Sequence, residues 1–317
     1  MPLMKPFFIA LKYLSFMIPS MAFGVILINF FISIGFLNRL TWIAKPLISF
    51  GHIRGECALS FITAFASPTA ANTMLMELFR KGTISKKELF ISSLINSFPA
   101  ILTHGRTMLP IIIPLLGKIG LIYFSILVFI GFLKTTFTLI IAHFLLPSPF
   151  NASIEKRIPS HTSLFEAFKQ SLKQSSFMLK RIMVITIPIT IFTFYLIHFG
   201  FFDFLSQSFK PIMQYIPLPT EALSIIAAQF GGHIAAYTVA SNLLVNGLIN
   251  GREIILALLW GTVITSIVSL RYFIPYYWGI FGPRLGTQIM LLSNGTRQIL
   301  IILTALSIHY WPEIIPF

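Results

Sequence analysis

Charged side chains are scarce in this chain: Asp, Glu, Lys and Arg together make up 10% of its 317 residues, against about 25% in a soluble domain. Hydrophobic residues make up 56%, and the mean hydropathy is +0.86. Many stretches of about 20 residues carry no charge, which is the length that an α-helix needs to cross a bilayer. The composition therefore excludes an ordinary soluble domain and predicts an all-α, polytopic transmembrane protein.

Acidic residues are scarcer than basic ones. The chain has 9 Asp and Glu and 23 Lys and Arg, for a net charge of +14. The basic residues lie between apolar spans and form no aromatic-interleaved basic face, so we expect no nucleic-acid partner. The positive-inside rule and anionic lipid headgroups account for them. We expect a multi-pass protein of the cell (plasma) membrane whose densest basic segments, 80–87 and 147–181, are cytoplasmic.

Cysteine and the common catalytic motifs are nearly absent. Cys57 stands alone, which excludes an internal disulfide, a cysteine metal cluster and an iron–sulfur site. There is no His-Glu-x-x-His, Gly-x-Ser-x-Gly, P-loop or dinucleotide glycine pattern. His52 and Glu56 share helical spacing, but two ligands make a poor metal site. We expect no cofactor, no metal and no enzymatic activity, because no paired general acid and base is present either.

The chain does contain an internal sequence repeat. Arg271 and Pro275 follow Arg106 and Pro110 at one offset (271 − 106 = 165). The same offset relates further pairs: Gly82 and Gly247, Glu88 and Glu253, Lys45-Pro46 and Lys210-Pro211, Gly35 and Gly200. In an apolar chain, duplication is typical of transporters, whose binding sites form where two halves face each other.

The apolar spans divide the chain into repeat one (1–146), a basic cytoplasmic linker (147–181) and repeat two (182–317). Within the linker, residues 162–180 predict an interfacial amphipathic helix, since several apolar residues share one face. These residues are Leu164, Phe165, Phe168 and Leu172. The predicted spans are 7–36, 57–79, 89–117 and 119–146, then 182–203, 221–246, 254–282 and 286–311.

Equivalent loops of the two repeats differ in charge. The loop 80–87 carries four basic residues, whereas its counterpart 246–253 carries only Arg252. This difference predicts inverted repeats, each with about three crossings plus a broken, re-entrant helical hairpin, and both termini outside. The alternative is that 57–79 and 221–246 are full crossings.

Each predicted hairpin is interrupted near its middle. Ser67 is a good N-cap and Pro68 a favoured first helical residue. A half-helix that begins there has free N–H groups and a positive dipole end, which suit an anion. In repeat two, Gly231 and Gly232 make the break. We expect substrate contacts from the polar residues of both: Ser67, Thr69, Asn72, Gln229, Gly232 and His233. The alternative is a kink in an ordinary crossing.

Arg106 and Arg271 are the second candidate element. Apolar residues continue for about ten positions after each arginine, and a proline follows four residues later. This pattern favours a broken helix with the arginine inside the protein, as countercharge or gate. An arginine that snorkels at a helix end is the alternative. The polar residues before Arg106 either line a path to it or bond neighbouring helices; they are Asn96, Ser97, Thr103 and His104.

A few titratable groups lie near the breaks. Glu56, Glu77 and Glu221 are candidates for coupling-ion, proton or gating sites, or else they are solvated or capping residues. His104 and His233 are candidate proton carriers, although a lone histidine in a helical bundle is more often structural.

The segments Gly55 to Gly117 and Thr220 to Gly286 resemble the nucleoside-recognition, or Gate, domain family. Each has a polar-broken apolar hairpin, a basic or glycine turn and a long broken span. Similar units occur in concentrative nucleoside transporters, ferrous-iron transporter membrane domains and spore maturation proteins. The resemblance implies an inverted-repeat transport fold. The iron transporters use cysteine near the membrane site and a fused G domain, whereas here Cys57 is alone and Glu221 occupies its position in repeat two.

Together these features predict a secondary carrier or flippase for a small anionic or phosphorylated solute, nucleoside-like or lipid-linked. The solute would bind at the midplane between the repeats. Two alternatives stay open: a non-transporting scaffold of the spore-maturation type and a divalent metal transporter. The expected partners are the substrate and anionic lipids, and a homodimer is compatible with the sequence.

Overall fold

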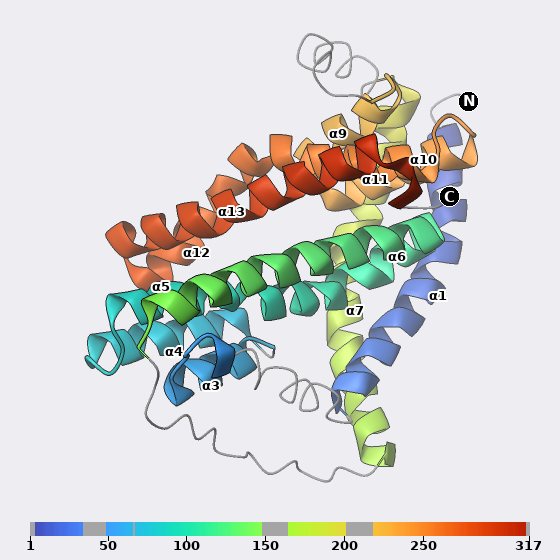
Figure 1. Cartoon of the computed structure of the whole chain (residues 1–317). Coiled ribbons are helices and arrows are strands. Elements are labelled where there is room, and N and C mark those ends of the chain that lie inside the picture. Colours follow the sequence, from blue (N-terminus) through green and yellow to red (C-terminus); the bar gives the residue numbers. More distant parts are fainter. Residues whose placement is uncertain (1–3, 34–48, 66, 148–163, 201–217, 315–317) are drawn as a thin grey trace.

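The computed structural model describes residues 4–33, 49–65, 67–147, 164–200 and 218–314, where every regular element is a helix (Figure 1). Several predictions lie outside the described residues: the pair Lys45-Pro46 and Lys210-Pro211, Gly35, and linker residues 148–163. The described part is treated below as a first half (4–147) and a second half (164–314).

The helices of the first half are α1 (Lys5–Ser33), α3 (Gly55–Ala64), α4 (Pro68–Arg80), α5 (Lys86–Ile95) and α6 (Ser97–Leu145). Those of the second half are α7 (Leu164–His198), α9 (Ala222–Gly231), α10 (His233–Val245), α11 (Gly251–Ile264), α12 (Ser266–Phe281) and α13 (Pro283–Tyr310). A short 3-10 helix, η2 (Pro312–Ile314), follows.

Helix bounds in the two halves coincide at the offset found in the sequence. Both ends of α10 lie 165 residues beyond those of α4 (233 − 68 = 165; 245 − 80 = 165). The start of α11 lies 165 residues beyond that of α5 (251 − 86 = 165). Both of these helices begin with a capping box, made by Ser85 and Glu88 in α5 and by Asn250 and Glu253 in α11. The same local signals therefore begin the same helices twice.

A tight glycine bend folds each half's last segment back on itself. Gly117 (φ 53°, ψ −127°) divides α6 into two arms, and Gly282 (φ 77°, ψ 167°) separates α12 from α13. The two arms pack closely at Gly120, where an added Cβ would lie only 2.7 Å from the Ile112 carbonyl oxygen. Figure 1 shows α13 lying along α6, so the two returning arms bring the halves together.

Each of the two long spans is interrupted at a polar residue. Asn96 separates α5 from α6, and Thr265 separates α11 from α12. Helix α6 continues through Pro110 and Pro114. A proline removes one backbone hydrogen bond and often kinks a helix without ending it. The predicted break in 89–117 is present, and the span predicted as 254–282 is two helices.

Helix α7 differs from its prediction. It runs unbroken from Leu164 to His198, where the sequence predicts an interfacial helix over 162–180 and a separate span from 182. No glycine interrupts it, and Pro188 lies inside it. The predicted apolar face is exposed, with Phe165 at 77%, whereas the small residues Ala167 and Ser171 are buried. Small residues let helices approach closely, and α7 packs along α1.

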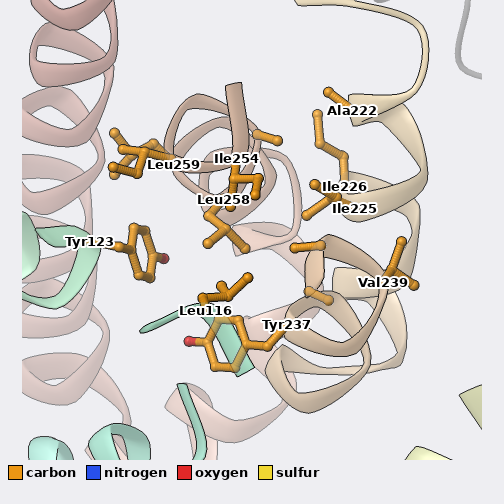
Figure 2. Close-up of a cluster of buried hydrophobic side chains, with 14 of the residues drawn as sticks. Leu116, Tyr123, Ala222, Ile225, Ile226, Tyr237, Val239, Ile254, Leu258 and Leu259 are labelled. Atoms are coloured by element: carbon orange, nitrogen blue, oxygen red, sulfur yellow. The ribbon is translucent and has the colours of Figure 1, made fainter. Parts of the chain in front are cut away.

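The core of the second half takes in part of the first. Figure 2 shows Leu116 and Tyr123 of α6 beside Leu258 of α11 and Tyr237 of α10. Outward-facing positions carry large apolar side chains, such as Phe144 (81% exposed), which suit contact with lipid. Among the described residues, the stretches 86–145 and 283–310 are long and apolar enough to cross a membrane.

Candidate functional site

The first predicted break is present between α3 and α4. Helix α3 ends at Ala64, and the Ser67 side chain caps α4 by accepting a hydrogen bond from the Ala70 backbone N–H at 3.2 Å. Pro68 is the first helical residue. Ser67 thus uses its hydroxyl on its own helix, as the N-cap pattern predicts.

Arg106 reaches the same break from α6. Its guanidinium donates a hydrogen bond at 3.1 Å to the carbonyl oxygen of Phe65, the residue that caps the C-terminus of α3. The last carbonyls of a helix lack partners within it, and a cation there complements the helix dipole. Arg106 is therefore partly buried and ties α6 to the broken hairpin.

A buried amide network extends this break to the second half. The Asn96 side-chain N–H₂ donates to Ser60 Oγ at 2.9 Å and to Asn72 Oδ1 at 3.1 Å. The Asn72 N–H₂ donates to the hydroxyl of Tyr276, on α12, at 3.1 Å. Thr69 also lies within hydrogen-bonding range of Tyr276. The first break is thus tied to the second half through a chain of side-chain hydrogen bonds, in which Asn96 Oδ1 has no partner among the described residues.

The second break depends on glycine. Gly232, between α9 and α10, has φ 124° and ψ 167°, and α10 has no side-chain cap. Gln229 is buried beside it, and its N–H₂ donates to the Leu258 carbonyl oxygen at 3.0 Å. Its Oε1 has no hydrogen-bond partner among the described residues. Gly261 makes room for this amide, because a Cβ there would lie 2.6 Å from Gln229 Cδ.

A cluster of basic side chains joins the two halves near this second break. It consists of Lys134 and His104 on α6, Arg297 on α13 and His233 at the start of α10, and is called the cationic cluster below. Arg297 lies within electrostatic reach of the other three and of the Tyr123 and Tyr277 hydroxyls. Lys134 is only 4% exposed, and its Nζ donates to Ser293 Oγ at 2.7 Å.

The cationic cluster has no acidic counterpart within the part of the chain that the structure describes. The two ion pairs found there, Arg54–Glu88 and Lys81–Glu77, involve other residues. His104 and His233 are exposed and Arg297 is partly exposed, so accessible space adjoins the cluster. On either side of Arg297, the Asn294 N–H₂ and Gln298 Oε1 are buried without a hydrogen-bond partner in those residues. Basic side chains gathered without a described acid favour the binding of an anion.

The predicted acidic residues lie elsewhere. Glu56 and Glu221 are exposed at the starts of α3 and α9. Glu77 is exposed near the end of α4, where its carboxylate accepts a hydrogen bond from Lys81 at 2.6 Å. The structure brings none of the three into the cationic cluster or the amide network. Arg271 belongs to α12, but its side chain is outside the described residues.

Sequence reasoning missed Lys134 and Arg297 because neither recurs at the offset. The matching positions are Ile299 (134 + 165 = 299) and Phe132 (297 − 165 = 132). A different signal was available, since each is a single charged residue within an otherwise apolar span. Burying such a charge costs free energy, so its presence indicates a functional site.

Comparisons with known proteins agree with the predicted resemblance. The model of the Gate family, described as nucleoside recognition, matches residues 179–284, which run from α7 into the start of α13. The predicted unit 55–117 lies outside that match.

Similar chains occur in Methanocaldococcus jannaschii. The uncharacterized protein MJ1556 is 34% identical over 93% of both chains. The uncharacterized protein MJ0880 is 27% identical over 89% of this chain and 93% of its own. No solved structure gives a significant match.

Proposed function

Because the chain belongs to the nucleoside-recognition (Gate) family of membrane proteins, as its likeness to MJ1556 and the family match show, we propose that it is a membrane carrier. It moves a small anionic or phosphorylated solute across the cell membrane and catalyses no reaction. Its two halves are inverted repeats of a polytopic fold, and the solute binds where they meet.

The observation that carries this proposal is the uncompensated positive charge of Lys134 and Arg297. Lys134 comes from the first half and Arg297 from the second, and no described acid pairs with either. Two like charges repel, and burial in a low dielectric strengthens that repulsion. A bound phosphate or carboxylate would remove the repulsion and could accept a hydrogen bond from the unpaired Asn294 N–H₂.

The helix break at Gly232 strengthens the same site. Helix α10 begins at His233, a member of the cationic cluster, and no side chain caps its first N–H groups. Free N–H groups and the positive end of the helix dipole bind anions. Discontinuous helices whose N-termini point at an anionic substrate recur in secondary carriers with inverted repeats. A site shared by two halves is also one that their relative movement can open to either side.

The charge of the site favours an anion over the divalent metal of the second alternative. A divalent cation would approach a lysine and an arginine without a described carboxylate nearby, which is electrostatically unfavourable. The scaffold alternative makes no use of an anion, so it predicts neither binding nor transport.

Thermal stability in detergent tests the proposal, since a ligand that binds only the folded state raises the unfolding temperature. We expect inorganic phosphate and nucleoside monophosphates to stabilise the wild-type chain, and uncharged nucleosides and divalent metals to have much smaller effects. Arg297→Gln should lose this response. Arg284→Gln is the matched control, because Arg284 lies exposed at the start of the same helix.

An Arg297→Gln variant that keeps the full anion response would contradict the proposed site. Counterflow of the stabilising anion in proteoliposomes then separates a carrier from a scaffold. A protein that binds the anion but exchanges none of it across the membrane would favour the scaffold.

A further inference from the structure

A large apolar groove lies apart from the polar face of the cationic cluster. Its volume is about 770 Å³, and it is formed by α5, the second arm of α6 and α13. The walls are mostly aliphatic and aromatic, with Phe90 and Leu94 from α5, Phe137 and Ile141 from α6, and Leu292 and Ile299 from α13. A wall of this composition suits a hydrocarbon chain better than a polar solute.

The length of the groove fits one acyl chain. Along α6 its lining runs from Lys134 to Leu145. Eleven residues of α-helix rise about 16 Å, which is close to half of the roughly 30 Å hydrocarbon core that two opposed acyl chains make up. A groove of this length can therefore hold one acyl chain of a phospholipid.

Two lysines stand at one end of the groove. Lys86 and Lys87 begin α5 and are exposed, and the Lys86 ammonium lies 5.4 Å from the centre of the Phe90 ring. Two of their basic neighbours are paired, Arg54 with Glu88 and Lys81 with Glu77. Neither Lys86 nor Lys87 has an ion pair among the described residues, so both are free to bind a phosphate.

The opposite end of the groove is closed to a headgroup. Lys134 lines it, but its Nζ is hydrogen-bonded to Ser293 Oγ at 2.7 Å and the side chain is only 4% exposed. The lysine stem, rather than its charge, therefore borders the groove. This arrangement gives the groove a direction, with charge at the Lys86 end and hydrocarbon along the rest.

We infer that the groove binds an anionic phospholipid, with its phosphate at Lys86 and Lys87 and one acyl chain along α6 toward Lys134. This lipid site borders the solute site at Lys134, whose stem lines the groove while its Nζ bonds to Ser293, and the inference does not depend on the solute site. Because α5 and α6 belong to the first half and α13 to the second, a lipid in this position touches both halves where they meet.

Quenching of tryptophan fluorescence by brominated lipid tests the inference in full-length protein. Phe137→Trp places a reporter in the groove at a position that is 56% exposed and so accepts a larger ring. The unsubstituted chain, with its 4 tryptophans, supplies the background to subtract. We expect brominated phosphatidylglycerol to quench the reporter at a much lower mole fraction in mixed micelles than brominated phosphatidylcholine does.

The two lysines set the size of that preference. Each lysine near an anionic lipid surface is worth about a fivefold change in affinity, so the pair predicts roughly 25-fold. Adding Lys86→Gln and Lys87→Gln to the reporter chain should remove the preference. Adding Lys118→Gln instead should keep the preference. Lys118 is an exposed lysine at the start of the second arm of α6, whereas the groove lies along the end of that arm.

Equal quenching by the two lipids, or a preference that survives loss of both lysines, would overturn the inference. Native mass spectrometry provides a second measurement without a reporter. The unsubstituted chain should retain phosphatidylglycerol in preference to phosphatidylcholine, and the chain without both lysines should show no preference. Retention of neither lipid by the unsubstituted chain would also count against the site.

Discussion

The two helix breaks stand at matched positions, Ser67 and Gly232 (232 − 67 = 165), yet their chemistry differs. At the first, Ser67 caps α4, Arg106 donates to the end of α3, and the Asn96 amide joins the hairpin to α5 and α6. At the second, a glycine backbone makes the turn, α10 begins uncapped and Gln229 keeps an unpaired oxygen.

This difference indicates that the two halves have different roles. The first break is held by side-chain hydrogen bonds, although Asn96 Oδ1 has no partner among the described residues. The second places the uncapped start of α10 and His233 at the cationic cluster. The two breaks share their position in the helix pattern, but their side chains make the first a support and the second the candidate binding surface. Four substitutions test the contrast.

The largest effect is expected at Gly232. Its φ and ψ fall in a region that is open almost only to glycine, so Gly232→Ala should lower the free energy of unfolding by about 2–3 kcal/mol. Unfolding titrations in mixed micelles measure it. Gly231→Ala is the matched control: it lies within α9, and its Cβ would meet only Ala235 Cβ, at 3.8 Å. That control should be neutral or slightly stabilising.

The next effect is expected at Asn96, which is 2% exposed. Asn96→Leu removes the donor to Asn72 Oδ1 and leaves that buried oxygen unpaired, so we expect a loss of about 2 kcal/mol in the same titration. In a double-mutant cycle, Asn96→Leu and Asn72→Leu should cost clearly less than the sum of the single changes. Simple additivity would mean that the two amides act independently.

Arg106→Gln separates support from substrate binding. Loss of a charged donor to the Phe65 carbonyl should lower stability by about 1.5 kcal/mol. Since the guanidinium is engaged at the break, we expect the anion-dependent rise in unfolding temperature to remain, in contrast to Arg297→Gln. If the anion response disappears along with the stability, Arg106 belongs to the solute site as the sequence predicts.

The smallest effect is expected at Ser67. Ser67→Ala removes one N-cap hydrogen bond and should cost about 1 kcal/mol. Ser67→Asp, which keeps a capping oxygen, should recover most of that loss. A cost for Ser67→Ala as large as that for Gly232→Ala would show that the two breaks are equally constrained, and the contrast drawn above would fail.

Local signals predicted the fold features that depend on neighbouring residues. Ser67-Pro68 and Gly231-Gly232 specify their own breaks through capping and backbone freedom, and the repeated offset located equivalent helices. The continuity of α7 was missed because a change from basic to apolar composition near residue 181 resembles a boundary, although nothing there ends a helix.

The site was harder to predict because its residues meet only in three dimensions. The contact from Arg106 to Phe65 spans 41 residues, and that from Lys134 to Ser293 spans 159. The repeated residues could not indicate the cationic cluster, because Lys134 and Arg297 have no basic equivalent in the other half. The predicted contributions of Thr69, His104 and His233 await the ligand measurements proposed above.

The uninterrupted course of α7 has a mechanical consequence. Its 35 residues span about 52 Å, far more than the roughly 30 Å of hydrocarbon that a bilayer offers. The lysine-bearing end therefore lies well away from the part of the same rod that packs on α10 (Figure 1). A partner, a salt change or a neighbouring membrane that tilts the lysine-bearing end applies leverage directly to the helix that begins at the glycine break.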